Sequence, residues 1–265
     1  IIIRGGGDLA TGVAVRLHRC GFDIVVLEIQ QPLAVRRRVA FAEAVDAGES
    51  EVGGVRAVFV PDSEHIPRLR SDRVVSVLVD PAANLSAQIK ASALIDGRMR
   101  KIPPETTLDS SLFTIGLGPG FTAGVNCNAV IETNRGHNMG RVIWQGSAEP
   151  DTKIPEEVAG FDVDRVLRAP VSGFLEGGKE IGSMMKAGDE IARVGGIPVE
   201  ALFDGALRGL VHDGVRIEAA AKIGDLDPRG EPSYCISISD KSLAVGGGVL
   251  EALLSQSHIR RLLSG

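Results

Sequence analysis

The chain has 265 residues, which is enough for one large domain or for two smaller ones. Its net charge of −5 and its single short basic run, Arg36–Arg38, argue against nucleic acid as a partner. It opens on Ile1–Gly5 without the features of a signal peptide, and no apolar run is long enough to cross a bilayer. We therefore expect a cytoplasmic protein with no membrane segment.

The three cysteines are Cys20, Cys127 and Cys235, each more than a hundred residues from the next. No CxxC pair occurs, so we expect neither a disulfide framework nor a zinc site, and no metal site is predicted. Glycine is unusually frequent, with 33 residues, whereas aromatic residues make up 4%. This composition favours tight turns and points where the backbone lies close to another group.

Short apolar runs alternate with helical stretches over the first 100 residues, and a further apolar run follows. Such an alternation predicts an α/β domain with a Rossmann-like parallel sheet covered on both faces. The expected strands are residues 1–3, 24–29, 55–60, 74–79, 93–95 and 112–117, and the expected helices are residues 8–20, 33–47 and 86–91.

Residues 129–133 and 141–144 flank a polar, glycine-containing turn and predict a β-hairpin. This hairpin closes an N-terminal domain over residues 1–146. Residues 147–164 contain prolines and acidic residues with little periodicity, and we interpret them as a linker.

A degenerate repeat occupies residues 165–232. Ala169–Gly173 is echoed by Ala201–Gly205, Gly182 by Gly214, and Lys186–Asp189 by Lys222–Asp225. Short strands with glycine turns at this spacing predict a small all-β domain built as a pseudo-twofold sandwich. The remaining segment, 233–265, contains an apolar helical pattern over 243–263 and is expected to pack back on the body of the protein.

The clearest chemical signal is the glycine-rich turn after the first strand. Gly5, Gly7 and Ala10 match the G-x-G-x-x-G/A fingerprint of dinucleotide-binding turns, with Gly6, Asp8 and Leu9 between them. Glycines allow a diphosphate to approach the backbone, and the start of the following helix offers free amide groups to the anion. The alternative is a purely structural turn.

Charged residues near this turn have two interpretations each. Glu28 closes the second strand 21 residues after Gly7, where an acidic residue can hold ribose hydroxyls, or it can be a solvated carboxylate. An acidic residue at this position favours NAD over NADP, because its charge would repel the 2′-phosphate of NADP. Asp8 suits a capping role at the helix start. Arg36–Arg38 can either reach an anion or form a solvated helix face.

A second glycine-rich loop contains Gly118 and Gly120, which can form an anion-binding nest or allow close packing. Just beyond it, Cys127 is either a nucleophile or a small buried hydrophobic residue. His137 in the hairpin turn is either a general acid–base group or a hydrogen-bonded turn residue. These two residues are the catalytic candidates.

Four strings carry a family resemblance. They are RGGGDLATG at Arg4–Gly12, EIQQPLAVRR at Glu28–Arg37, GPGFTAG at Gly118–Gly124 and AVIETNRGH at Ala129–His137, joined by Arg168–Pro170. Together they resemble the selenium-dependent molybdenum hydroxylase system proteins, over nearly the whole chain. The N-terminal half is also distantly similar to the xanthine dehydrogenase accessory proteins.

This resemblance implies an accessory protein that binds, modifies or delivers a molybdopterin-type cofactor. The implied ligands are an NAD-like dinucleotide or a molybdopterin dinucleotide, and the implied partners are a molybdenum hydroxylase or other cofactor-maturation proteins. A homo-oligomer is compatible with it. Two alternatives stay open: an NAD- or FAD-dependent oxidoreductase acting on a small molecule, and a non-catalytic scaffold. Whether a reaction is catalysed is left open.

The 165–232 segment separately resembles a biotinyl/lipoyl-like barrel-sandwich. Those domains carry their cofactor on a lysine at a hairpin between the halves. Here the corresponding place contains Gly195–Pro198, and no lysine occurs between Lys186 and Lys222. The resemblance therefore implies a scaffold, a docking surface or a lid, and not a swinging-arm carrier.

Overall fold

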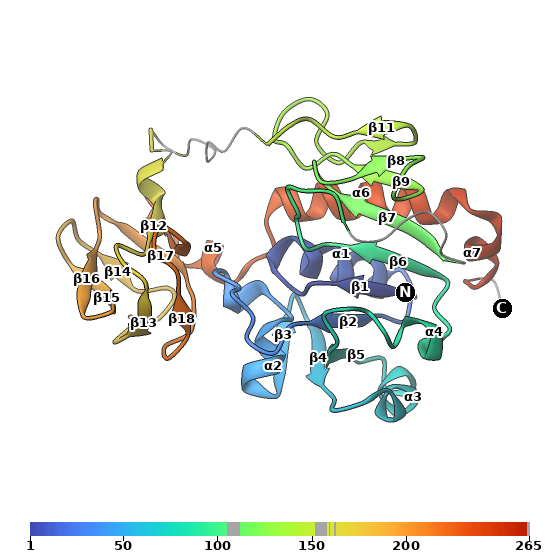
Figure 1. The fold of residues 1–265 in the computed structure, drawn as a ribbon, viewed down its shortest axis with the longest axis horizontal. Helices are drawn as coiled ribbons and strands as arrows, with labels where there is room; N and C mark the ends of the chain where they lie inside the picture. The colour runs from blue at the N-terminus through green and yellow to red at the C-terminus, as the bar shows by residue number, and fades with distance from the viewer. Residues whose placement is uncertain (105–111, 152–157, 159, 162, 264–265) are drawn as a thin grey trace. The chain divides into compact units, whose positions relative to one another are not determined.

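A computed structural model describes residues 1–104, 112–151, 158, 160–161 and 163–263 (Figure 1). Contacts divide the chain into two compact units. Unit 1 comprises Ile1–Pro32, Ala40–Thr152 and Ile238–Gly265, and unit 2 comprises Leu33–Val39 and Lys153–Ser237. The expected linker, 147–164, lies partly outside the described residues. Within the described part of the chain, no helix is both long enough and apolar enough to cross a membrane.

Unit 1 is built on one nine-stranded sheet with the order β10-β9-β7-β6-β1-β2-β5-β4-β3. The seven strands from β9 to β4 in this order run parallel, and β10 and β3 pair antiparallel at the two edges. The strands are β1 (Ile2–Arg4), β2 (Val25–Glu28), β3 (Glu49–Val52), β4 (Val55–Phe59), β5 (Val75–Val79), β6 (Ala93–Asp96), β7 (Phe113–Leu117), β9 (Ala129–Ile131) and β10 (Val142–Ile143). A separate short pair joins β8 (Thr122–Ala123) to β11 (Gly146–Ser147).

Apolar side chains bury both faces of this sheet. Ile2, Leu27 and Leu94 face one core, which is completed by Ile66 and by partly buried residues of α3 (Ile66–Ser71) and α4 (Ser86–Ile89). Ile3, Val26 and Ile95 alternate with these residues along the strands and are also buried, on the opposite face. Continuous apolar strands are therefore explained by a sheet that is covered on both sides.

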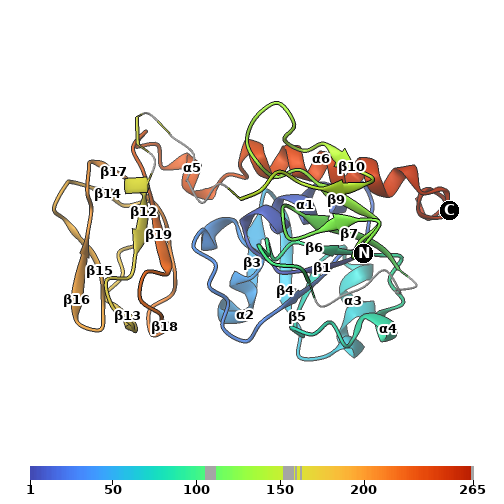
Figure 2. The same cartoon turned by 45° about the horizontal axis from the view of Figure 1, so that its top comes forward.

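Two helices lie side by side in unit 1, α1 (Asp8–Arg19) and α6 (Asp240–Ser255), as Figures 1 and 2 both show. Their contact depends on small residues. A Cβ atom added at Gly12 would overlap the Ser242 side chain. Further along α6, one added at Gly248 would overlap the carbonyl oxygen of Gly140, in the loop before β10. The remaining helices of the unit are α2 (Glu43–Ala47) and α7 (Ser257–Arg261), with the 3₁₀ turn η2 (Ser63–His65).

The predicted helix over residues 33–47 is wrong. This stretch contains only the 3₁₀ turn η1 (Arg37–Val39) and the five-residue helix α2. Leu33–Val39 belongs to unit 2, where a Cβ added at Gly209 would lie 2.7 Å from the carbonyl oxygen of Val35. Packing against a distant part of the chain therefore overrides the helical composition of this segment.

Unit 2 consists of two four-stranded antiparallel sheets, with the orders β12-β19-β17-β14 and β16-β15-β13-β18. Their facing side chains form a single apolar core that includes Leu175, Ile191, Leu207 and Ile223. The elements are η3 (Val163–Arg165), β12 (Val166–Arg168), β13 (Gly173–Glu176), β14 (Met184–Met185), β15 (Glu190–Val194), β16 (Ile197–Glu200), β17 (Gly205–Leu210), β18 (Arg216–Ile217), β19 (Lys222–Asp227) and α5 (Ser233–Ile236).

Equivalent positions in the two halves of the repeat of unit 2 are 32 residues apart. The strands β17, β18 and β19 each begin 32 residues after β13, β14 and β15. The echoes of Gly173 in Gly205 and of Gly182 in Gly214 follow this register. Lys186–Asp189 and Lys222–Asp225 do not follow this register, because the spacing between them is four residues longer than the repeat spacing. Each sheet takes strands from both halves of the repeat.

The predicted fold class needs correction in both of its parts. The large sheet is mixed, with antiparallel edge strands β3 and β10, and is not the Rossmann-like parallel sheet that was expected. The second unit is a pair of small antiparallel sheets that also takes in Leu33–Val39, and is not a continuous biotinyl/lipoyl-like barrel-sandwich domain. Strand β3 was missed because its sequence, ESEV, lacks the apolar run by which buried strands are recognised.

Two adjacent glycines of α6 give a matched test of the contact between the helices and the rest of unit 1. Gly248→Ala forces a methyl group against Gly140, and we expect unfolding to become easier by about 1–3 kcal/mol. Gly247→Ala meets only the end of the Arg16 side chain, and we expect a gain of about 0.5–1 kcal/mol from helix propensity. Urea unfolding of both variants measures the difference, and equal stabilities would contradict the packing described.

Candidate functional site

The glycine-rich turn leaves β1 at the carboxyl end of the parallel strands and leads directly into α1. Gly5 has a φ of +86°, a left-handed conformation that favours glycine, and its amide donates to the carbonyl oxygen of Leu27 at 2.7 Å. Gly7 is the N-cap of α1 in extended conformation, and no side chain caps the helix there. The amide groups of the first turn of α1 therefore follow a half-buried turn, and no side chain caps them.

The glycines of this turn have different reasons to be small. A Cβ added at Gly6 would lie 2.8 Å from the amide nitrogen of Ala42, so Gly6 is needed for internal packing. A Cβ added at Gly7 would meet no atom within 4 Å, so nothing in the protein's own packing requires glycine there. Open space beside Gly7 is what the backbone needs if a ligand is to approach it closely.

The other residues of the fingerprint pack inward. Leu9 and Ala10 are buried, and a Cβ added at Gly97, just after β6, would lie 2.7 Å from Cβ of Ala10. A small residue at position 10 thus lets the helix approach the sheet. Asp8 is the first residue of α1 and not its N-cap; its charge lies in the first helical turn, where the helix dipole stabilises an anion.

Glu28 lies at this turn. Its Oε1 accepts a hydrogen bond from the amide of Gly6 at 2.5 Å, and its Oε2 accepts one from the amide of Ile29 at 2.8 Å. Burial raises the pKa of the Glu28 carboxyl above its ordinary value, against the opposing effect of these two hydrogen bonds. The structure thus places Glu28 beside Gly6, which agrees with the expectation drawn from the spacing of 21 residues between Gly7 and Glu28.

Charged side chains that the sequence did not single out gather at the same edge. Asp96, at the end of β6, accepts hydrogen bonds from the Arg98 guanidinium at 2.6 and 2.9 Å and lies 3.8 Å from that of Arg4. The Arg4 and Asp96 side chains are both buried. Arg98 also lies against Gly5, with its Cγ 3.2 Å from the position of an added Cβ. The signal that could have found Asp96 is its position as the last residue of an apolar strand.

The second glycine loop follows β7 at the same edge. Gly118 has a φ of +82°, and an added Cβ would lie 2.7 Å from Oγ1 of Thr133. A Cβ added at Gly120 would overlap the carbonyl oxygen of Arg100. Close packing therefore accounts for both glycines. Glu132 beside them is buried, and its carboxylate accepts hydrogen bonds from the amides of Asn134 and Glu149 at 2.7 and 2.8 Å.

The two catalytic candidates lie in different environments. Cys127 is 1% exposed, and burial raises the pKa of its thiol to about 11, which disfavours the nucleophilic thiolate at neutral pH. Its surroundings are apolar, including Phe121, Ala123 and Val130. His137 is exposed in the turn between β9 and β10. The environment of Cys127 matches a small buried hydrophobic residue better than a nucleophile, whereas the exposure of His137 does not decide between its two interpretations.

The basic run Arg36–Arg38 holds η1 within unit 2. Arg36 donates to the carbonyl oxygens of Tyr234 and Ser237 at 3.0 and 3.2 Å, and Arg37 donates to that of Leu210 at 2.7 Å. These two arginines therefore have structural contacts that neither sequence interpretation anticipated.

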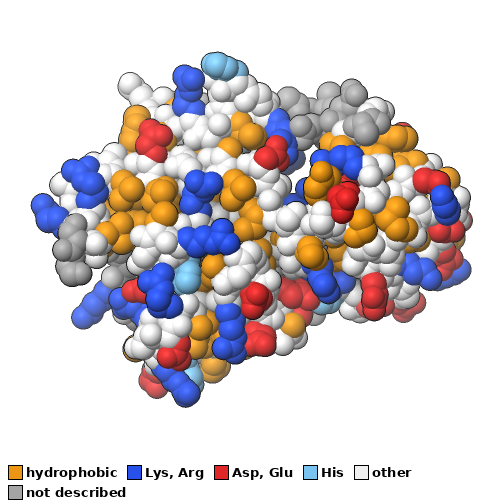
Figure 3. Space-filling view, turned by 180° about the vertical axis from the view of Figure 1, so that it is seen from behind, with side chains coloured by type: hydrophobic (Ala, Val, Ile, Leu, Met, Phe, Trp, Pro, Cys, Tyr) orange, Lys and Arg blue, Asp and Glu red, His pale blue; other side chains and the backbone are white. Residues whose placement is uncertain are grey.

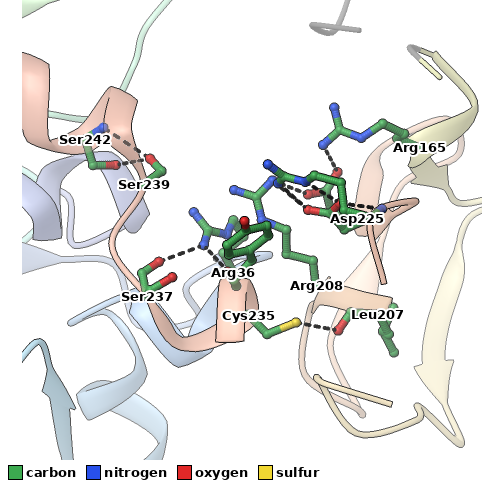
Figure 4. Close-up of polar contacts among 12 residues, drawn as sticks. Arg36, Arg165, Leu207, Arg208, Asp225, Cys235, Ser237, Ser239 and Ser242 are labelled. Carbon is green, nitrogen blue, oxygen red and sulfur yellow. Dashed lines mark hydrogen bonds and ion pairs between the residues drawn. The ribbon is translucent and has the colours of Figure 1, made fainter. Parts of the chain in front are cut away.

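Unit 2 also contains a buried charge cluster. Asp225 lies 3.4 Å from both Arg165 and Arg208, and Figure 4 shows both guanidinium groups directed at it. Burial alone would raise the pKa of neighbouring Asp227, but hydrogen bonds from Arg229 and the charges of Arg229 and Arg208 outweigh burial and lower it. The ionised Asp227 carboxylate is thus a partner of the arginines, as in a structural network.

The described residues include no group of three or more His, Cys, Asp or Glu side chains arranged to hold a metal ion. On the face drawn in Figure 3, Lys and Arg side chains are dispersed among hydrophobic and acidic ones.

No family model matches the chain. An Escherichia coli (strain K12) protein, named as uncharacterized protein YqeB, is 44% identical over 258 residues, which cover 97% of this chain and 48% of that protein. The chain thus spans about half the length of this curated relative.

Similar solved structures share little of the fold. They include an aspartoacylase family protein from Mesorhizobium loti, with 9% identity, a TM-score of 0.24 and coverage of 76% of this chain and 56% of that one. Another is a succinylglutamate desuccinylase/aspartoacylase from Rhodobacter sphaeroides, with 12% identity, a TM-score of 0.25 and coverage of 85% and 86%. With TM-scores this low, neither protein supports an assignment of fold or activity to this chain.

The raised pKa of Glu28 predicts how stability responds to pH. Because burial penalises the ionised form, the wild-type protein loses stability as pH rises from below 4.5, the carboxyl's ordinary pKa, through the higher folded value. Glu28→Gln keeps an acceptor for the Gly6 amide but cannot ionise. We expect the variant to be the more stable at pH 7 and the advantage to vanish below about pH 4. Thermal unfolding between pH 3.5 and 8 measures this.

Glu149→Gln is the matched control with the opposite sign. Hydrogen bonds from Asn134 and Asn138 lower the pKa of the exposed Glu149 carboxyl, so wild type should be the more stable at neutral pH and lose that advantage on acidification. A stability difference that shifted in favour of wild type over Glu28→Gln as the pH rose would contradict the environment described for Glu28, whereas a constant offset would reflect the lost acceptor for the Ile29 amide.

The cysteine environments predict selective thiol chemistry. Cys20 is exposed, whereas Cys127 and Cys235 are buried, and burial raises the pKa of both buried thiols. With Ellman's reagent at pH 8, we expect one thiol of the native protein to react rapidly, and all three to react in denaturant. Cys20→Ser should abolish the rapid phase, and its survival in that variant would show that a buried cysteine is accessible.

Proposed function

We propose that this chain binds a dinucleotide or a molybdopterin dinucleotide through its glycine-rich turn and serves in the maturation of selenium-dependent molybdenum hydroxylases. The observation that carries the proposal is the common location of the family-like strings. Arg4–Gly12, Glu28–Arg37 and Gly118–Gly124 begin at, or directly follow, the carboxyl ends of β1, β2 and β7, and Ala129–His137 comprises β9 and the turn that follows its carboxyl end. Ligands of open α/β sheets bind at this edge.

A diphosphate fits the turn through backbone groups. The space beside Gly7 leaves the backbone accessible, and the first-turn amides of α1 are not capped by a side chain. Asp8 opposes an anion by its charge, so recognition depends on amide groups and the helix dipole. Arg98, which is held by Asp96 and lies against Gly5, provides a cation at the turn. A molybdopterin dinucleotide would contribute the diphosphate that such a site recognises.

Glu28 suits the ribose of the same ligand. Its carboxylate is already fixed beside the turn by the amides of Gly6 and Ile29, so little side-chain freedom remains to be lost on binding. A carboxylate accepts hydrogen bonds from vicinal hydroxyls and repels a 2′-phosphate. The expected preference is therefore for ligands with a free ribose 2′-hydroxyl.

The competing redox function requires a proton-handling side chain near the ligand. Its best candidate, His137, is exposed in a hairpin turn, and Cys127 is buried with a raised thiol pKa. Neither arrangement favours catalysis, so we propose an accessory role and treat redox activity as an outcome of the test.

The test is a thermal-shift panel on the full chain with NAD, NADP, FAD, cytidine nucleotides and molybdopterin cytosine dinucleotide. A ligand at a hundred times its Kd adds about 2.7 kcal/mol of stability. For a protein of this size, that corresponds to a rise in Tm of roughly 5–10 °C. We expect a shift with the molybdopterin or cytidine ligand, reduced in Glu28→Ala.

Gly7→Ala is the sharper variant because the added methyl group meets no protein atom and the φ of −65° suits any residue. Its Tm without ligand should equal that of wild type, while the ligand-induced shift should disappear; Gly7→Asp should do the same. Cofactor loading of a partner hydroxylase that survives Gly7→Asp would refute the site. A shift with NAD or FAD alone would favour a redox enzyme, and no shift with any ligand would favour a scaffold.

A further inference from the structure

The order of the strands reverses at β1. Strands β2 to β5 lie on one side of it, and β6, β7, β9 and β10 lie on the other, as Figure 1 shows for β1 and its neighbours. Ligands of open α/β sheets bind at such a point, outside the carboxyl ends of the two strands from which the chain diverges. Here those strands are β1 and β6. The loop after β1 is the glycine-rich turn, and the loop after β6 begins with Gly97 and Arg98.

The loop after β6 packs against the glycine-rich turn. The amide of Gly97 donates to the carbonyl oxygen of Arg4 at 2.9 Å. A Cβ added at Gly5 would lie 3.2 Å from Cγ of Arg98 and 3.4 Å from its Cα and its amide nitrogen. The next residue, Met99, has a φ of +55°, which a residue other than glycine rarely adopts. Such strain persists where neighbouring contacts fix the backbone, often at a ligand site. Arg98 therefore extends from a loop whose course is fixed.

Asp96 fixes the guanidinium group of Arg98. Nε and Nη2 of Arg98 donate to the Asp96 carboxylate at 2.9 and 2.6 Å, and the Arg98 amide donates to Oδ1 at 3.2 Å. The side chain of Asp96 is 4% exposed and that of Arg98 is 24% exposed, so the cation is the accessible member of the pair. A guanidinium group held in this way loses little side-chain freedom when it binds an anion.

Carboxylates near the turn give this cation a purpose. Asp8 lies in the first turn of α1, and the carboxylate of Glu28 accepts a hydrogen bond from the turn itself. Both repel an approaching phosphate, whereas the backbone amides of the helix start attract it only with partial charges. Arg98 lies at the same turn and carries a full positive charge. Its planar fork can pair with two oxygens of one phosphate.

We propose that the turn binds two linked phosphates, one at the first-turn amides of α1 and the other at the Arg98 guanidinium group, with Asp96 as a positioning residue. This inference rests on the proposed function, because it concerns the ligand of the same turn. Arg98 is then the residue that distinguishes diphosphates, free or within a dinucleotide, from monophosphates and nucleosides.

Calorimetric titration of the full chain with inorganic pyrophosphate tests the role of Arg98 without a base or a ribose. We expect one pyrophosphate to bind per chain, and orthophosphate to bind more weakly. Arg98→Gln should weaken pyrophosphate binding by roughly tenfold or more and affect orthophosphate less, since one charge-assisted contact is lost. Arg98→Lys keeps the charge but not the fork and should weaken pyrophosphate binding by about threefold.

Two control variants accompany Arg98→Gln. Lys101→Gln removes a positive charge three residues further along the same loop, where Lys101 is exposed and pairs with Asp151, and it should leave the affinity unchanged. Glu28→Ala removes a negative charge and the proposed ribose contact, so it should not weaken pyrophosphate binding. Equal affinities of Arg98→Gln and Lys101→Gln for pyrophosphate would overturn the inference.

Asp96→Asn distinguishes positioning from a simple effect of charge. Removal of a negative charge beside an anion site should by itself strengthen pyrophosphate binding. If Asp96 positions Arg98, the variant should instead weaken binding, by about two- to fivefold, while the same change made in the Arg98→Gln background should strengthen it. Stronger binding in both backgrounds would refute the positioning role. The Arg98 variants decide the diphosphate assignment even if Asp96→Asn does not fold.

Failure of this inference can be told apart from failure of the proposed function. Dinucleotides that raise the Tm of wild type but not of Gly7→Ala would uphold the turn as the site, whatever Arg98 does. If Arg98→Gln then bound pyrophosphate as tightly as wild type, or wild type bound no pyrophosphate, the role of Arg98 alone would be wrong. Absence of any dinucleotide shift would count against the proposed function itself.

Discussion

Close approach of backbones around α1 is the constraint on which unit 1 depends. The helix meets the sheet where Gly97 faces Ala10, and it meets α6 where Gly12 faces Ser242. Further along α6, Gly248 lies against Gly140 in the loop before β10. A glycine stands at each of these contacts, and the first two hold the axis of α1 close to the sheet and to α6. This packing fixes the start of α1, and with it the turn at Gly5–Gly7, at the carboxyl edge of the sheet.

Several buried or half-buried charged residues of unit 1 lie at the same edge. Arg4, Glu28, Asp80 and Asp96 are the last residues of parallel strands or directly follow them, and each has a partner in the backbone or in another side chain. Asp80, for example, accepts hydrogen bonds from the amides of Asn84 and Leu85 at 3.1 and 2.8 Å. A polar edge that is already ordered requires little reorganisation when a ligand binds.

Local sequence signals predicted the part of this edge that is continuous in the chain. The strand–turn–helix at residues 1–19, the strand ending at Glu28, and the antiparallel pairing of β9 with β10 follow from glycine turns and apolar periodicity. The contact of Arg4 with Asp96 could not be predicted in this way, because it requires β6 to lie beside β1 across ninety residues of chain. Likewise, nothing local marks Glu49–Val52 as a strand, since an edge strand can be polar on both faces.

The segment Leu33–Val39 makes both units discontinuous in sequence. Unit 2 contains this early segment together with residues up to Ser237, and unit 1 needs α6, which begins at Asp240, to cover α1. Neither core can be completed until the segments around Ser237 and α6 have left the ribosome. Contacts between residues so distant in sequence slow folding and leave apolar surface exposed during synthesis. We therefore expect folding of both units to be delayed during synthesis, in contrast to the domain-by-domain folding that a linear division into domains would allow.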